Sequence, residues 1–90
     1  MDIPDSKNFL IYLKEHNNIN LNFITNIKFN KKSITIKIKN KDFFFNNLFT
    51  EKSLYNLIIV NVSNYLRDNN LNGWDIDYLK YKYQKINIKY

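Results

Sequence analysis

Two consecutive segments with alternating apolar and polar residues constrain the fold of this 90-residue chain most strongly. In residues 19–29 the odd positions are apolar except for Thr25, and this phase leaves Ile24 on the polar face. In residues 34–39 isoleucines alternate with threonine and lysine. A period of two is typical of a strand with one buried face. Because the intervening residues 30–33 are polar, the pattern predicts a β-hairpin.

Helical spacing of apolar residues predicts one helix on each side of this hairpin. The first covers residues 6–16, where Pro4 precedes residue types that cap helices, and its apolar stripe is Phe9, Leu10 and Leu13. The second covers residues 51–68, with Thr50 as its N-cap. Its apolar face consists of Leu54, Leu57, Ile58, Val62, Tyr65 and Leu66.

The remaining segments give weaker patterns. Residues 41–45 fit a short strand or a buried loop, and both alternatives stay open. After the predicted turn at residues 72–73, alternation resumes at Trp74, Ile76 and Tyr78. It resumes again, after a change of phase, at Ile86, Ile88 and Tyr90. We therefore expect two C-terminal strands with a bend near residues 83–85.

These elements predict an α+β fold in the order helix, strand, strand, helix, strand, strand. We expect one antiparallel sheet packed on two helices. No linker-like segment or internal repeat interrupts the chain, so residues 1–90 are expected to form a single domain.

The charge balance is basic, with 14 Lys and Arg against 8 Asp and Glu and a formal net charge of +6. Asn occurs 17 times and Lys 13 times, and both have A/T-rich codons. A nucleotide bias in the genome would also give a basic protein, so the charge suggests an anionic partner without establishing one.

The basic candidate residues concentrate on the predicted hairpin. Its polar face and tip carry Lys28, Lys31, Lys32, Lys37, Lys39 and Lys41. Lys80, Lys82, Lys85 and Lys89 lie on the predicted C-terminal strands, and we rank them lower. A row of lysines on one strand face neutralises successive phosphates of a nucleic acid. The alternative is a solvated face whose lysines prevent edge-to-edge pairing of sheets.

Residue types that support catalysis or metal binding are sparse. His16 is the only histidine and there is no cysteine, so a metal site or a cysteine nucleophile is not expected. Asp75 and Asp77 would share one strand face, which suits a solvated surface better than acid-base chemistry. Gly73 is the only glycine, which excludes a glycine-rich phosphate loop. We expect neither an enzyme nor a cofactor, and no small-molecule substrate.

The aromatic residues have two possible roles. Residues 43–45 and Phe49 are aromatic and could stack on unpaired bases. Core packing is the stronger expectation, because a chain without alanine needs large side chains to fill its interior. Trp74 and Tyr65 are likewise expected in the core.

The sequence also bears on location. Its longest apolar run, residues 57–60, is far shorter than the roughly 20 residues that cross a bilayer. The N-terminal residues 1–5 are acidic and lack the basic start of a signal peptide. We expect a cytoplasmic protein without a membrane partner.

Three groups of residues resemble a known family in order and approximate spacing. Asn8 and Phe9, followed by residues 12–15 (Tyr-Leu-Lys-Glu), are similar to its opening helix. Residues 31–35 (Lys-Lys-Ser-Ile-Thr) are similar to its central hairpin turn. Residues 65–74 (Tyr-Leu-Arg-Asp-Asn-Asn-Leu-Asn-Gly-Trp) make the strongest match. The chain thus resembles the eukaryote-type large-subunit ribosomal protein twenty-two family, as a shortened and divergent member.

The resemblance implies an α+β protein on the outer face of the large ribosomal subunit. Its partners would be ribosomal RNA and neighbouring ribosomal proteins, and it would have no enzymatic activity. In the family, the second helix, the hairpin tip and neighbouring loops contact RNA. By position, Arg67 and Lys31 match the basic residues of those regions.

Together, these observations predict a structural constituent of the large subunit that binds RNA through a basic hairpin face. The alternative function is a small protein-binding inhibitor or immunity module of a mobile element. The predicted RNA-binding residues are Lys28, Lys31, Lys32, Lys37, Lys39, Lys41, Arg67, Lys80 and Lys82.

Overall fold

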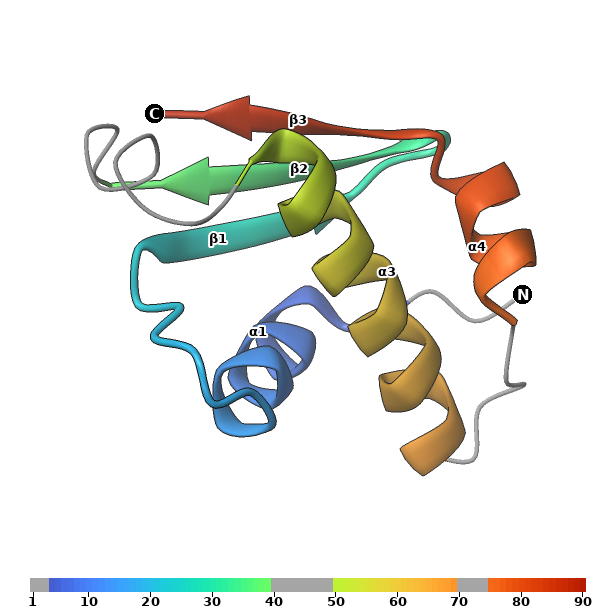
Figure 1. Ribbon diagram of the computed structural model, residues 1–90, viewed down its shortest axis with the longest axis horizontal. Coiled ribbons are helices and arrows are strands. Elements are labelled where there is room, and N and C mark those ends of the chain that lie inside the picture. Colours follow the sequence, from blue (N-terminus) through green and yellow to red (C-terminus); the bar gives the residue numbers. More distant parts are fainter. Residues whose placement is uncertain (1–3, 40–49, 70–74) are drawn as a thin grey trace.

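A computed structural model describes residues 4–39, 50–69 and 75–90. Its elements, in chain order, are α1 (Ser6–Glu15), β1 (Ile24–Phe29), β2 (Ser33–Ile38), α3 (Glu51–Asp68), α4 (Ile76–Lys82) and β3 (Lys85–Lys89). Figure 1 shows α1 and α3 on the same side of the three-stranded sheet, with α4 at one end of it. The predicted α+β class is confirmed.

The two predicted helices are confirmed almost to the residue. Asp5 caps α1 by accepting a hydrogen bond from the backbone N–H of Asn8 at 3.0 Å. Thr50 caps α3, and the side chain of Ser53 bonds back to the Thr50 N–H to complete a capping box. These caps satisfy backbone donors that the first helical turn leaves without partners.

The strands β1 and β2 form the predicted antiparallel hairpin, with Phe29 opposite Ile34 and Ile24 opposite Ile38. The first strand is shorter than expected, because only Ile24–Phe29 of residues 19–29 is extended. The register shifts between Ile24 and Asn26. A bulge of this kind reverses the phase of the pleat, so Ile24 is buried, and the sequence-based placement on the polar face is wrong.

The third strand corrects the predicted topology. β3 pairs with β2 in parallel, so the sheet is mixed rather than antiparallel, in the order β1-β2-β3. The cause is the position at which the chain re-enters the sheet. The N–H of Gln84, just before β3, donates to the carbonyl oxygen of Lys32 at the hairpin tip, at 2.8 Å. β3 therefore starts where β2 starts and runs in the same direction.

Residues 76–82 form a helix, so the first of the two expected C-terminal strands is wrong. Asp75 caps α4 by accepting a hydrogen bond from the N–H of Tyr78 at 2.7 Å. Leu79 and Tyr83, four residues apart, are fully buried, whereas Ile76 and Tyr78 are each 38% exposed. Burial thus follows the helical period rather than the apolar alternation.

The core lies between the sheet and the helices α1 and α3. The buried isoleucines of β2 all face it, as the alternation of residues 34–39 predicts. Phe9 from α1 packs edge-on against Phe29 and Tyr65, with ring centroids 5.5 and 5.6 Å apart, and so links three elements. In the described part of the chain, no helix combines the length and the apolarity that crossing a membrane requires.

Several predictions concern residues outside those that the structure describes. These are the strand or buried loop at residues 41–45, the aromatic platform that includes Phe49, the turn at residues 72–73 and the buried position of Trp74.

Candidate nucleic-acid interface

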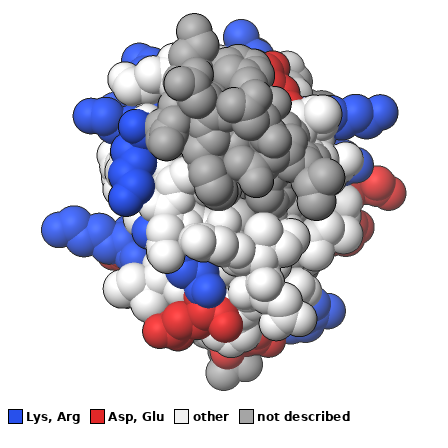
Figure 2. All heavy atoms as spheres, turned by 60° about the vertical axis from the view of Figure 1, so that its left-hand side comes forward, with Lys and Arg blue, Asp and Glu red and all other residues white. Residues whose placement is uncertain are grey.

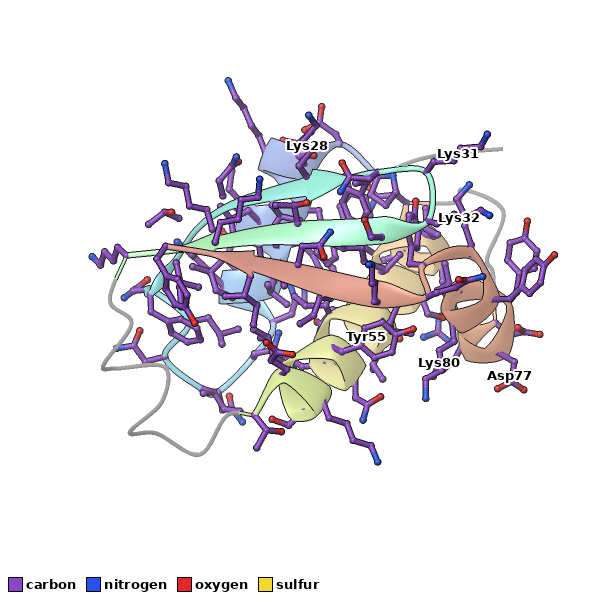
Figure 3. The ribbon with its side chains drawn as sticks, turned by 90° about the horizontal axis from the view of Figure 1, so that it is seen from above. Lys28, Lys31, Lys32, Tyr55, Asp77 and Lys80 are labelled. Atoms are coloured by element: carbon purple, nitrogen blue, oxygen red, sulfur yellow. The ribbon has the colours of Figure 1, made fainter. Side chains whose placement is uncertain are left out.

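One face of the sheet packs on the helices, and the other carries polar side chains. Asn26, Lys28, Thr35, Lys37, Lys85, Asn87 and Lys89 alternate with the core residues and define what we call the open sheet face. Seen from above in Figure 3, the strands lie in front of α1 and α3. None of the described helices covers this face.

The charge of the open sheet face has one sign. The three strands contain four lysines and no aspartate or glutamate. Lys28, Lys37, Lys85 and Lys89 are all exposed. Lys37 and Lys89 are register partners on the adjacent strands β2 and β3. Like charges directly opposite each other destabilise a sheet, so an anion bound across this pair would relieve a repulsion that the fold maintains.

A hydrogen-bonded row of polar side chains runs between these lysines. The Asn30 side-chain amide donates to the hydroxyl oxygens of Thr35 at 2.7 Å and of Ser33 at 3.2 Å. The Asn87 amide donates to the same Ser33 oxygen at 3.2 Å. These bonds connect the hairpin to β3, so they hold the three strands of the face in a defined arrangement.

The hairpin tip extends the basic surface beyond the sheet. Lys31 and Lys32 lie between β1 and β2 and are exposed, as predicted. A cleft of about 330 Å³ separates the tip from α4. Its lining consists of Lys31, Lys32, Tyr78, Tyr81, Lys82 and Gln84.

The helical structure of residues 76–82 changes the positions of two predicted site residues. Lys80 and Lys82 lie on α4 rather than on a strand. Lys82 lines the cleft beside the tip lysines. Lys80 extends from the opposite side of α4, away from Lys31 (Figure 3). The structure therefore groups Lys82 with the hairpin and separates Lys80 from it.

Arg67 lies apart from the hairpin, near the C-terminal end of α3. Figure 1 shows this end of α3 remote from the sheet. The guanidinium of Arg67 donates to the side chain of Asn64. The neighbouring Asp68 accepts a hydrogen bond from Tyr12 at 2.8 Å, which joins α1 to α3. Burial, with that bond to Asp68, raises the pKa of Tyr12 to about 12.

Two predicted lysines remain. One lies at the edge of the open sheet face, and the other lies outside the described residues. Lys39 directly follows β2 and is exposed, and its backbone N–H donates to the carbonyl oxygen of Phe23 at 3.0 Å. Lys41 lies outside the described residues. In Figure 2 the end of the molecule where β2 and β3 finish comes forward, and Lys or Arg side chains project at several places around its outline, together with some Asp or Glu side chains.

The side chains considered for acid-base chemistry make local structural interactions. The ring of His16 stacks on Tyr12 with centroids 3.9 Å apart, at the C-terminal end of α1. Asp75 is the N-cap of α4 and Asp77 lies in its first turn, so the expected shared strand face is wrong. Within residues 4–39, 50–69 and 75–90, no three His, Asp or Glu side chains group as metal ligands would.

Sequence reasoning ranked the β3 lysines below those of the hairpin and did not single out the tyrosines of α4 as candidate site residues. Lys85 and Lys89 alternate with Ile86 and Ile88, so their exposure was predictable, but their place beside Lys37 depends on the parallel pairing. No local pattern indicates that Tyr81 faces the hairpin tip, because the two are distant in sequence.

No protein-family model, curated protein or solved structure matches this chain. A function is therefore inferred from the geometry of the open sheet face and of the cleft, and from the resemblance of residues 8–15, 31–35 and 65–74.

Proposed function

We propose that this protein binds ribosomal RNA through the open sheet face and the hairpin tip, as a structural and non-enzymatic component of the large ribosomal subunit. The observation that supports RNA binding most directly is the single-signed charge of the open sheet face. The three strands contribute lysines and no acidic residue, and Lys37 and Lys89 lie side by side. The ribosomal assignment is supported by the resemblance of the three segments to the ribosomal family.

The spacing of the lysines suits a nucleic-acid backbone. Alternate residues on a strand are about 7 Å apart, and neighbouring strands are about 5 Å apart, so lysines on this face reach successive phosphates. Each phosphate that a lysine neutralises releases a condensed counterion, which favours binding at low salt. The acidic residues of the described segments lie on helices or at their caps, and none of them lies in a strand.

Sedimentation tests the ribosomal assignment. We expect the native protein to co-sediment with large subunits in a sucrose gradient at low salt, and to be released as salt increases. Recovery only in the ribosome-free top fractions would contradict the assignment. An inhibitor or immunity module would give that result, and its purified form would show no salt-sensitive absorbance excess at 260 nm.

A salt titration tests the surface. We predict that replacing Lys37 and Lys89 together by Ala lowers the slope of log affinity against log salt by roughly 1.4 to 1.8, since each contact contributes about 0.7 to 0.9. The matched control replaces Lys7 and Lys52, exposed residues of α1 and α3, and removes the same charge. Binding of both variants to a ribosomal RNA hairpin is measured by fluorescence anisotropy. Equal slopes for the two variants would show that net charge, rather than this face, drives binding.

A further inference from the structure

We propose that the cleft between the hairpin tip and α4 binds a single unpaired nucleotide of the RNA, with its base on the ring of Tyr81 and its phosphate near the tip lysines. This inference rests on the proposed RNA-binding function and adds to it the kind of RNA that is recognised. It concerns the cleft rather than the open sheet face.

The first observation is the exposure of the α4 tyrosines. Tyr81 is 75% exposed and Tyr78 is 38% exposed. Their ring centroids lie 6.4 Å apart, with planes tilted by 39°. Leu79 and Tyr83 provide the core contacts of this helix, so the fold does not need the ring of Tyr81 for packing. An exposed aromatic ring is a stacking surface that accepts any base, because every base has a π-face.

The second observation is the charge around those rings. Three of the six lining residues are lysines: Lys31 and Lys32 from the tip and Lys82 from α4. None of the described residues that line the cleft is acidic. A nucleotide combines an anionic phosphate with a planar base, and this cleft combines cations with exposed aromatic rings. The volume of about 330 Å³ lies at the lower end of the roughly 300–1,000 Å³ typical of ligand sites, which suits one nucleotide.

The third observation is that the two walls of the cleft are tied together. The Gln84 N–H bonds to the Lys32 carbonyl oxygen at 2.8 Å, which joins the end of α4 to the hairpin tip. Beneath them, Tyr83 is fully buried, and its carbonyl oxygen accepts a hydrogen bond from the Tyr55 hydroxyl at 2.6 Å. The cleft is thus built before a ligand arrives, which lowers the entropic cost of binding.

The geometry favours an unpaired nucleotide over a paired one. A base within a duplex is stacked on its neighbours and cannot place its face on a protein side chain, whereas a bulged base can. The open sheet face contacts only the backbone and accepts duplex RNA. The cleft therefore predicts a preference for a bulged RNA over a continuous duplex.

Two RNAs and three variants test this inference. The RNAs are a short duplex and the same duplex with one bulged uridine. We expect the natural protein to bind the bulged RNA more tightly. Tyr81→Ala should weaken binding to the bulged RNA by roughly tenfold and leave binding to the duplex unchanged. Tyr81→Phe should retain the preference because it keeps the ring. Tyr90→Ala is the matched control, since Tyr90 is 57% exposed at the opposite end of β3.

The outcomes separate this inference from the proposed function. Equal, salt-sensitive binding of both RNAs by the natural protein would overturn the cleft assignment and leave RNA binding intact. Binding of neither RNA would overturn both. If Tyr90→Ala lost the bulge preference as Tyr81→Ala does, the stacking site would not be the cleft. A 4-thiouridine at the bulge should cross-link to Tyr81, and a cross-link confined to the open sheet face would also contradict the inference.

Discussion

Tyr83 is fully buried, and its hydroxyl has no hydrogen-bond partner within the described part of the chain. Its ring packs against Phe29 with centroids 5.6 Å apart, and the Lys82 ammonium lies 5.6 Å from the ring centroid. The ring therefore contributes packing at the junction of α4 and β3, while the hydroxyl carries an uncompensated desolvation cost of about 1 to 3 kcal/mol.

Replacing Tyr83 by Phe should raise the free energy of unfolding by about 1 kcal/mol, because it removes that hydroxyl and keeps the ring. The gain in the free energy of unfolding should be larger at alkaline pH. Burial, with repulsion from Tyr78, raises the pKa of Tyr83 from 10.0 to about 12. The stabilisation that this shift represents is complete below pH 10 and is lost as the pH rises to about 12.

Urea unfolding below pH 10 and between pH 10 and 12 tests this prediction for both proteins. The natural protein should lose up to about 3 kcal/mol more than the Phe variant across that range. Tyr55→Phe is the control and should lower stability, since it removes a hydrogen bond that is made. A Phe variant as alkali-sensitive as the natural protein would show that the Tyr83 hydroxyl loses its proton at the same pH in the folded and unfolded states.

At the scale of elements, α4 shows how a short helix forms where the apolar alternation indicates a strand. It has seven residues, too few for stability in isolation. Its N-cap at Asp75, Asp77 in the first turn, and Lys80 and Lys82 in the last turn all suit the helix dipole. Burial of Leu79 and Tyr83 on one side completes the set of interactions that favours the helix.

We predict that Asp75→Ala destabilises the protein by about 1 kcal/mol, because the Tyr78 N–H loses its acceptor. Asp75→Ser should restore most of this loss, since a serine hydroxyl also caps helices. Chemical denaturation gives the stability, and hydrogen exchange of α4 amides localises the change. The prediction fails if Asp75→Ala and Asp75→Ser unfold alike.

At the scale of the whole molecule, the fold depends on contacts among elements that are far apart in sequence. Phe9 is fully buried and touches rings of β1 and α3 from its place on α1. The helices cover one face of the sheet, and the lysines lie on the opposite face. The core and the candidate interface therefore lie on opposite faces of one sheet.

Phe9→Ala should lower the free energy of unfolding by about 3 to 5 kcal/mol, because it opens a cavity where three elements meet. This is a large part of the roughly 5 to 15 kcal/mol typical of a domain. Phe9→Leu should cost less, since it leaves a smaller cavity. Equilibrium urea unfolding measures both. A loss below about 1 kcal/mol for Phe9→Ala would show that α1 is not essential to the core.

Elements with local signals can be predicted from the order of the amino acids alone. Thr50 and the apolar spacing after it specify α3, and the isoleucine alternation of residues 34–39 specifies β2 and the face on which Lys37 lies. The cluster of basic residues on the hairpin and its tip was predictable for the same reason. Three features could not be predicted in this way: the bulge that buries Ile24, the helix α4 and the parallel pairing of β3. Each of these depends on contacts with distant residues, such as the bond from Gln84 to Lys32. The free energies of such contacts exceed the weak local conformational preferences of the segments involved.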